Sequence, residues 1–424
     1  MEARFIALAI FVIAYLLFVI LPTRRSWVAI TAAVLTVLTQ TITVQQALVA
    51  VNWNVMGIFV GTLVIANLFI GSRMPAYLAE MIVNRSKNTC FAILFICALT
   101  GVISAFVENV ATLMIIAPVA LSLARKLDIH PVNLLIAIAV SSNLQGAGTL
   151  IGDPPSMLLA GFAKMNFMDF FFYKGKLSIF FAVQLGALVS MVFLYWVFRK
   201  ERHKKTTLLP EEKILSWFPS ILLGVLLVAL AISSFFDPAF SYLAGILCLI
   251  AAAIGVAWDM KVHKGPLIDR VKTLDWDTTF FLIGVFVLVG SLTLTGWTEV
   301  IAISISKIIG QNILLGFLLL VCIAVVMSAF VDNVPFLAAM LPVVMLISSK
   351  LSVDPTVFLF GLLLGASIGG NVTPVGAAAN IVCMGILRKE GYNVRFMDFV
   401  KIGLPFTLVS VTASCVFIWL VWSP

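Results

Sequence analysis

Two short segments of the sequence place an acid next to an amide inside long apolar stretches. SAFVENV contains Glu108 and Asn109, and SAFVDNV contains Asp332 and Asn333, 224 positions later. An acid at the centre of a membrane helix costs about 2.5–3.5 kcal/mol on insertion scales, and such residues generally serve a function. Their oxygen atoms suit a hard cation such as Na⁺, and a carboxylate shielded from water also takes up a proton more readily. The structural alternative is that both acids only cap the helices that follow them.

The composition indicates the protein class that must position these groups. Of the 424 residues, 62% are hydrophobic and 11% are charged, and the mean hydropathy is +1.15. Soluble domains carry about 25% charged residues. Apolar windows of about 20 residues recur along the chain, each long enough to cross the bilayer as a helix, and they lack the alternation of barrel strands. We therefore expect an all-α polytopic membrane protein, in which the block at 5–22 is a retained helix because no cleavage site follows it.

The basic residues predict the orientation of the chain. Placing the N-terminus outside the cell membrane puts all but six of the 27 Lys and Arg residues on the cytoplasmic side, as the positive-inside rule requires. The exceptions are Arg4, Lys164, Lys174, Lys176, Lys307 and Lys350. This distribution also explains the net charge of +8 without nucleic-acid binding.

The two halves of the chain repeat one another. VNWNVMGIFVG (51–61) matches LDWDTTFFLIG (274–284), and TLIGDPP (149–155) matches TPVGAAA (373–379), at an offset of 223 or 224 residues. Chance similarity between apolar segments would not hold one offset across polar landmarks. Since the predicted topology starts the first copy outside and the second copy inside, the copies would be inverted repeats, an architecture of secondary transporters.

The repeat predicts four parts of the chain. N-terminal scaffold helices occupy 1–50, repeat one occupies 51–198, and repeat two occupies 274–424. Between the repeats, 199–273 holds a cytoplasmic connector and two further scaffold helices. Lipid bilayer surrounds all four parts.

Each repeat contains two segments that do not look like simple membrane crossings. The segments at about 90–126 and 312–350 carry charge of the same side at both ends, so each is predicted to be a re-entrant hairpin of two short helices. Helices at about 131–163 and 355–386 hold clusters of Gly, Pro, Ser and Asn, and are predicted to be broken in the middle. Two hairpin tips and two unwound loops would then meet at one polar cavity. Asp153 is equally suited to ligation there and to capping, because GDPP is a helix-start pattern.

These paired motifs resemble the ion transporter superfamily, and nearest its branch of ArsB-type arsenite permeases and the melanosomal P protein. The NhaD-type sodium/proton antiporters and the divalent anion/sodium symporters are similar at a greater distance. The resemblance implies inverted repeats with hairpins and broken helices, a homodimer, and an elevator-type transport domain that moves against a scaffold. Matched position by position, it implies ion-binding residues that comprise Ser104, Glu108, Asn109, Asn143, Gly148, Thr149, Ser328, Asp332, Asn333, Asn371 and Thr373. Asp153 completes the predicted site on the strength of its place in the unwound loop alone.

The resemblance and the residues together limit the substrate. Na⁺ would lie near the amides of Asn109, Asn143, Asn333 and Asn371. The Ser-Asn-Thr triplets of the divalent anion symporters are missing, because Leu144 follows SSN and Val110 follows Asn109. The central segments also hold no Lys or Arg to neutralise a carboxylate substrate. We therefore expect transport of a small inorganic ion or a metalloid hydroxide such as arsenite, coupled to H⁺ or Na⁺, with a Na⁺/H⁺ antiporter or a sodium-coupled anion symporter as alternatives.

Other function classes find little support in the sequence. The three histidines lie near the ends of apolar segments without a nucleophile at a suitable spacing, so an embedded enzyme is not expected. The six cysteines form no CxxC pair that would indicate a disulfide framework or a zinc site, and no cofactor is predicted beyond the coupling ion. A phosphate-binding loop is also missing, so energy from ATP would have to come from a separate ATPase subunit.

Overall fold

The computed structural model describes residues 2–127, 129–203, 213–263, 272 and 274–424. Helices dominate these residues, and ten of the described helices are long and apolar enough to cross a membrane. The expectation of a helical polytopic membrane protein is confirmed. A two-residue antiparallel ladder, β1 (Phe172–Tyr173) with β2 (Lys176–Leu177), is a small departure from an all-α chain. Part of the predicted connector, residues 204–212, and part of the segment before repeat two, residues 264–271 and 273, lie outside the described residues.

Seven α-helices of each sequence repeat follow one another in the same order, whereas the short elements around them differ between the halves. The first half contains α1 (Glu2–Ile20), η1 (Pro22–Arg24), α2 (Arg25–Leu38), α3 (Val44–Ala50), α4 (Trp53–Gly71), α5 (Met74–Arg85), α6 (Thr89–Ser104), α7 (Asn109–Leu127), α8 (Pro131–Gly146), α9 (Pro154–Ala163), η2 (Met168–Phe170), α10 (Ile179–Phe198) and η3 (Arg199–His203). The second half contains α11 (Phe218–Phe236), α12 (Leu243–His263), α14 (Trp276–Leu294), α15 (Trp297–Ile309), α16 (Ile313–Phe330), α17 (Asn333–Leu351), α18 (Thr356–Gly369), η4 (Gly370–Val372), α19 (Ala378–Lys389) and α20 (Phe396–Trp422).

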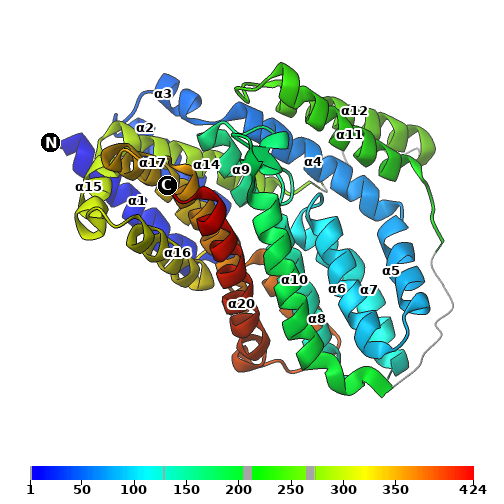
Figure 1. The fold of residues 1–424 in the computed structure, drawn as a ribbon. Coiled ribbons are helices and arrows are strands. Elements are labelled where there is room, and N and C mark those ends of the chain that lie inside the picture. The colour runs from blue at the N-terminus through cyan, green and yellow to red at the C-terminus, as the bar shows by residue number, and fades with distance from the viewer. Residues whose placement is uncertain (1, 128, 204–212, 264–271, 273) are drawn as a thin grey trace.

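The first two helices of each half pack against the other half. Helix α12 lies along α4, and α2 lies along α14 (Figure 1). Glycines permit both crossings, because a Cβ on Gly61 would meet the backbone of Cys248, and a Cβ on Gly284 would meet the backbone of Ala29, in each case within 3.0 Å. The structural correspondence therefore extends beyond the sequence repeat, to α1 and α2 in one half and α11 and α12 in the other.

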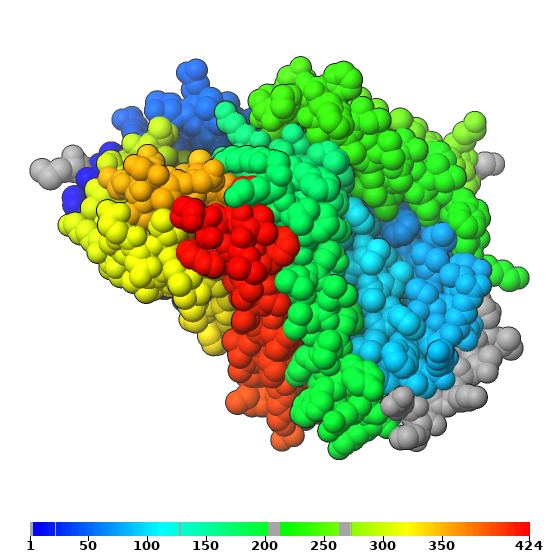
Figure 2. All heavy atoms as spheres, viewed as in Figure 1, coloured from blue at the N-terminus to red at the C-terminus, as the bar shows by residue number. Residues whose placement is uncertain are grey.

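Helices α10 and α20 are also equivalent and lie side by side at the centre of the molecule (Figure 1). Figure 2 shows the red C-terminal helix beside the green α10 on the surface that faces the viewer. Ser414 of α20 donates a hydrogen bond of 2.9 Å to the carbonyl oxygen of Ala182 in α10, and Gly186 lets the two backbones approach near Ser410. This contact joins the end of one half to the end of the other.

The predicted hairpin segments correspond to α6 with α7 and to α16 with α17. Their arms contain 16, 19, 18 and 19 residues. At 1.5 Å per residue these arms are about 24–28 Å long, close to the ~30 Å hydrocarbon thickness. The arms are therefore longer than the two short helices expected, and the re-entrant course of the hairpins stays a prediction. The tips lie at residues 105–108 and 331–332.

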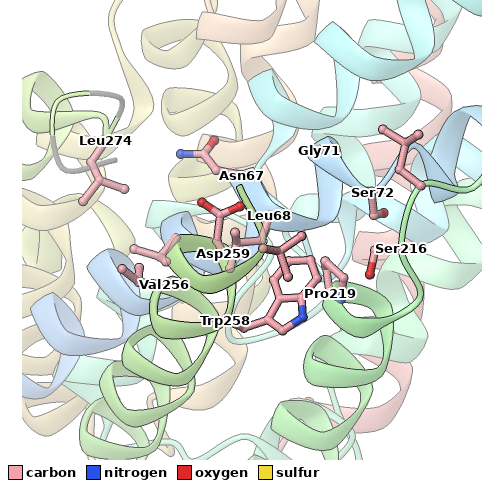
Figure 3. A pocket seen from close by; sticks show the side chains of 13 residues that line it. Asn67, Leu68, Gly71, Ser72, Ser216, Pro219, Val256, Trp258, Asp259 and Leu274 are labelled. Carbon is pink, nitrogen blue, oxygen red and sulfur yellow. The ribbon is translucent and has the colours of Figure 1, made fainter. Parts of the chain in front are cut away.

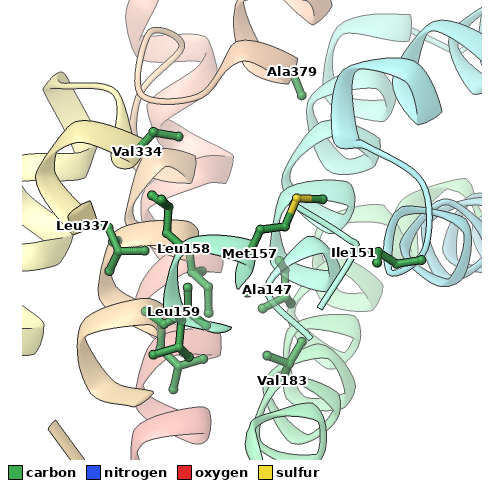
Figure 4. Packing of buried hydrophobic residues seen from close by; sticks show 14 of the residues in the cluster. Ala147, Ile151, Met157, Leu158, Leu159, Val183, Val334, Leu337 and Ala379 are labelled. Carbon is green, nitrogen blue, oxygen red and sulfur yellow. The ribbon is translucent and has the colours of Figure 1, made fainter. Parts of the chain in front are cut away.

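The predicted broken helices correspond to α8 with α9 and to α18 with α19. Helix α8 ends at Gly146, and α9 begins at Pro154. Gly152 is required here, because a Cβ would come within 3.0 Å of the carbonyl oxygens of Gly146 and Ala105. Gly376 repeats this close approach against Gly370 and Ser328. Figure 4 shows how α9 is anchored: Leu158 and Leu159 are buried next to α17, and Met157 lies near Ala147 and Ile151.

Candidate functional site

The two hairpin tips, the two helix interruptions and the start of α14 surround one small cavity. Its volume is about 80 Å³. Residues from α2, α4, α7, α8, α9, α14, α17, α18 and α19 contribute to its wall, and the polar ones are Arg25, Glu108, Asn109, Asn143, Asp153, Asp275, Thr278, Asp332, Asn333 and Ser367. Six of the twelve residues predicted from the sequence are in this wall: Glu108, Asn109, Asn143, Asp153, Asp332 and Asn333. Glu108 and Asp332, which are 224 positions apart, therefore face a common space.

Three of the cavity acids also cap helices. Glu108 Oε2 accepts a hydrogen bond of 2.9 Å from the backbone N–H of Ala111 in α7. Asp332 Oδ1 accepts one of 3.0 Å from Val334, and Asp153 Oδ1 accepts one of 2.9 Å from Ser156. These hydrogen bonds show that the three acids do cap the helices that follow them, which is the structural role expected as the alternative to ion binding. It engages one oxygen of each carboxylate, so capping and ion binding are compatible.

The fourth acid of the cavity, Asp275, was missed by the sequence reasoning. It is the N-cap of α14, where its Oδ1 accepts from the backbone N–H of Thr278 at 3.0 Å and its Oδ2 accepts from the Thr278 hydroxyl at 2.6 Å. The signal was visible in the repeat, because LDWD replaces the two amides of VNWN with Asp275 and Asp277. Glu108 and Asp275 line the same cavity, so two negative charges there would repel one another.

The structure also places a basic residue in the cavity wall. Arg25, at the start of α2, forms an ion pair with Asp332 through Nη1 and Oδ2. Its Nη2 donates to the Thr278 hydroxyl at 3.0 Å, and its Nε lies 3.4 Å from Asp277 Oδ2. The central segments themselves hold no Lys or Arg, as expected, but the inference that no basic group faces the site does not hold, because Arg25 reaches it from α2. Arg25 had been counted among the cytoplasmic surface charges, since only the packing of α2 against α14 brings it to the hairpin tip.

The other six predicted residues lie outside the cavity wall. Their hydrogen bonds hold the segments that form the wall in place. Thr149 donates a hydroxyl hydrogen bond to the carbonyl oxygen of Ala105 in the first hairpin tip, and Thr373 donates one to that of Ala329 in the last turn of α16. Ser328 donates to the carbonyl oxygen of Ala366, and Ser104 accepts from Ser142 at 2.8 Å. Gly148 follows the end of α8, where its N–H donates to the carbonyl oxygen of Gln145 at 2.9 Å.

Asn371, the last of these six, belongs to a buried amide cluster behind the cavity. Asn143 Nδ2 donates to Asn371 Oδ1 at 2.8 Å and to Asn380 Oδ1 at 2.9 Å. Asn371 in turn donates to the carbonyl oxygen of Val140 at 3.0 Å. These bonds hold the interruption of α18–α19 against α8, so the two broken helices form one unit.

The size and charge of the cavity limit what it can hold. Pockets for drug-sized molecules have volumes of about 300–1,000 Å³. At about 80 Å³ the present cavity has room for a small ion with a few water molecules, since each water in the liquid occupies about 30 Å³. Four carboxylates and one guanidinium line it, so the fully ionised wall is negative. This arrangement favours cations over anions.

A second cavity of about 580 Å³ lies between α4, α11 and α12 (Figure 3). Its wall is mostly apolar, with Asn67, Ser72, Ser216 and Asp259 as polar members. None of the twelve predicted residues lines it. Its volume exceeds that of the acidic cavity, but the hairpin tips and helix interruptions are elsewhere.

Comparison with known proteins assigns the family. A family model described as citrate transporter, CitMHS, matches residues 15–264 and 245–423. The chain belongs to the CitMHS family. An uncharacterized transporter of Mycobacterium tuberculosis is 30% identical over 374 residues, which cover 87% of this chain and 86% of the relative. The human P protein is 24% identical over 448 residues, which cover 86% of this chain and 53% of the P protein. The predicted resemblance to the ion transporter superfamily and its P-protein branch is confirmed.

Two solved structures share the fold of this CitMHS chain. The YdaH transporter of Alcanivorax borkumensis has a TM-score of 0.64 at 13% identity, and the match covers 91% of this chain and 88% of YdaH. Neisseria gonorrhoeae MtrF, described as one of a class of antimetabolite efflux pumps, has a TM-score of 0.58 at 14% identity and covers 92% and 85%. These structures show the fold, and the family match shows that the CitMHS chain is a multi-pass membrane transporter.

Proposed function

We propose that this CitMHS protein is a secondary transporter whose acidic cavity binds a small cation, H⁺ or Na⁺, and exchanges one for the other across the membrane. The supporting observation is the placement of Glu108, Asp153, Asp275 and Asp332 around about 80 Å³ of space. Carboxylates in such a space favour a bound cation or proton, because their charges cannot all persist close together without compensation. Uptake of one cation would then favour release of another, which is the coupling that an antiporter needs.

A metalloid hydroxide such as arsenite is the second candidate substrate. Asn109, Asn143, Asn333 and Ser367 contribute neutral donors and acceptors to the same wall. A neutral hydroxide would hydrogen-bond to these groups without a charge penalty, while the acids carried the coupling H⁺ or Na⁺. This reaction was our first expectation from the sequence, and the presence of four acids now favours cation exchange over it.

Citrate, the substrate in the description of the family model, suits the cavity less well. A tricarboxylate would meet four acids and a single guanidinium, so most of the charges facing it would repel it. We therefore do not extend the citrate description to this chain.

Alternating access would use the equivalence of the two halves. The hairpins and broken helices form the central unit, and contacts cross between the halves at α7 with α19 and at α9 with α17. Helices α1, α2, α11 and α12 lie at the outside of this arrangement and would supply the scaffold and the contacts of a homodimer (Figure 1). An inverted orientation of the halves and an elevator movement of the central unit are parts of the proposal.

Reconstituted proteoliposomes test the proposal. An imposed Na⁺ gradient without any solute should drive proton movement, read by an internal pH dye, in the wild type. Glu108→Gln and Asp332→Asn should fold but lose this flux, while Glu299→Gln, which changes an exposed acid of α15, should retain it. Flux that appears only when arsenite is supplied would select the second candidate. Unchanged Na⁺-driven flux in both cavity variants would contradict the assignment of these acids to the ion site.

A further inference from the structure

Arg25 connects helix α2, near the N-terminus, to the hairpin tip of the second half. It is the first residue of α2, whereas its partner Asp332 lies at the tip between α16 and α17, 307 positions away in the chain. The guanidinium carbon also lies 5.0 Å from the centre of the Phe281 ring in α14. The Arg25 side chain is 20% exposed and that of Asp332 is 26% exposed, so the pair is only partly accessible to water.

We propose that Arg25 is a built-in counter-cation that occupies the Asp332 side of the cavity until a transported cation displaces it. This inference rests on the proposed function, since it requires that the cavity binds a mobile cation. It assigns Arg25 as a positioning residue that sets how tightly that cation binds.

The two oxygens of Asp332 show why displacement is needed. Oδ1 is used by the backbone N–H of Val334, and Oδ2 is used by Arg25. A cation that approaches this carboxylate would therefore compete with the guanidinium for Oδ2. The two positive charges also repel one another at such short range, so their occupancy is competitive.

A displaced Arg25 would remain among acceptors. Its Nε already lies 3.4 Å from Asp277, and its Nη2 already donates to Thr278. Asp277 itself is held by the hydroxyl of Ser26, the residue next to Arg25. Release from Asp332 therefore would not leave a guanidinium without compensation, which keeps the free-energy cost of the exchange low.

The position in the first half that matches Asp277 carries an amide and makes no ion pair. Asn54, which matches Asp277, donates to the carbonyl oxygen of Phe240 at 3.1 Å and accepts from the N–H of Gly245 at 2.7 Å. Helix α12 is thus attached to α4 by a neutral amide, whereas α2 is attached to α14 by ions. Within the described part of the chain, Glu108 makes no ion pair like that of Asp332. Arg25 therefore pairs directly with the Asp332 side of the cavity and not with the Glu108 side.

Cation binding to the purified full-length protein tests this inference. Thermal unfolding would be followed in detergent as NaCl replaces choline chloride at constant ionic strength and pH. Arg25→Gln should lower the Na⁺ concentration that gives half of the stabilisation by about tenfold, equivalent to about 1.4 kcal/mol, because the competing charge is gone. Arg24→Gln removes the neighbouring exposed charge and should behave as the wild type. Arg25→Lys keeps a charge but loses the fork of donors, so its midpoint should lie between wild type and Arg25→Gln.

The outcomes separate this inference from the proposed function. A wild type that responds to Na⁺, with the same midpoint in Arg25→Gln and Arg25→Lys, would overturn the role of Arg25 alone. Absence of any Na⁺ response in the wild type and in Arg25→Gln would overturn the cation site and the inference together. If Arg25→Gln does not accumulate in the membrane, Arg25→Lys provides the test. A Na⁺ midpoint of Arg25→Lys equal to that of the wild type would then contradict the inference.

Discussion

Thr149 and Thr373 make the same hydrogen bond in the two halves of the chain: each hydroxyl donates to the carbonyl oxygen of an alanine at or next to the hairpin tip of its own half. Those alanines, Ala105 and Ala329, are 224 positions apart, as are the threonines. The bonds fix the loop of each broken helix to the tip beside it. The geometry of the cavity therefore depends on these two equivalent hydrogen bonds as well as on the acids.

Removing either of these threonine hydrogen bonds should lower the free energy of unfolding by a similar amount. Thr149→Val and Thr373→Val keep the shape of the side chain but leave a buried carbonyl without its donor, which costs about 1–3 kcal/mol. Thermal or chemical unfolding in detergent measures this loss. Thr62→Val is the matched control, because the Thr62 hydroxyl bonds only within its own helix. A loss in only one of the two variants would argue against the structural equivalence of the halves.

The glycines at the helix interruptions predict a steric effect. Gly152→Ala and Gly376→Ala would push a Cβ against backbone carbonyls at 3.0 Å or less, so both should be strongly destabilised or fail to accumulate in the membrane. Gly224→Ala is the control, since nothing lies within 4 Å of its added Cβ, and it should be neutral or stabilising by up to about 1 kcal/mol. Membrane yield and unfolding temperature report both effects. Normal stability of the first two variants would contradict the close approach.

An ion pair outside the membrane-spanning helices predicts a pH effect. Lys174 Nζ lies 2.6 Å from Asp354 Oδ2, between the β1–β2 turn and the α17–α18 connection. Partial burial alone would raise the pKa of Asp354, but hydrogen bonds from Lys174 and Thr356 outweigh it and hold that pKa below its ordinary value. The stabilisation is therefore complete above the unfolded-state pKa of about 3.9 and is lost as the pH falls through the lower folded-state pKa.

Asp354→Asn tests this pH effect. The variant should be less stable than the wild type at neutral pH by less than about 1 kcal/mol, because both partners are half exposed. The difference should shrink as the pH falls below about 4, because the carboxyl of the unfolded wild type takes up a proton there before that of the folded protein does. Unfolding temperatures between pH 3 and 7 provide the comparison, with Lys174→Met as a second way to remove the pair. A difference that grows in acid would have the wrong sign.

The charge of the cavity predicts discrimination against citrate. In proteoliposomes, internal citrate should not support uptake of labelled citrate above the level of empty vesicles, with or without Na⁺. The same vesicles should show Na⁺-driven proton movement, which serves as the positive control. Citrate counterflow that disappears in Arg25→Gln would instead indicate that the guanidinium serves an anionic substrate.

The sequence predicted the meeting of distant segments better than it predicted the details of the site. Glu108 and Asp332 stood out because an acid is costly among apolar residues, and six of the twelve proposed residues line the cavity. Arg25 could not be recognised in this way, because its neighbours in the sequence look like an ordinary cytoplasmic helix end. Asp275 could have been noticed from its replacement of Asn52 in the repeat. The hairpin arms are longer than expected, because apolar composition does not fix the residue at which a helix ends.

The crossing of α2 onto α14 and of α12 onto α4 has a consequence for how the molecule is assembled. The first two helices of each half pack against the other half. A half produced alone would therefore leave one side of its own α4 or α14 uncovered. A polypeptide divided between α10 and α11 should accordingly yield two fragments that are degraded when produced singly and that accumulate together when co-expressed. The duplicated halves have become mutually dependent parts of a single folding unit.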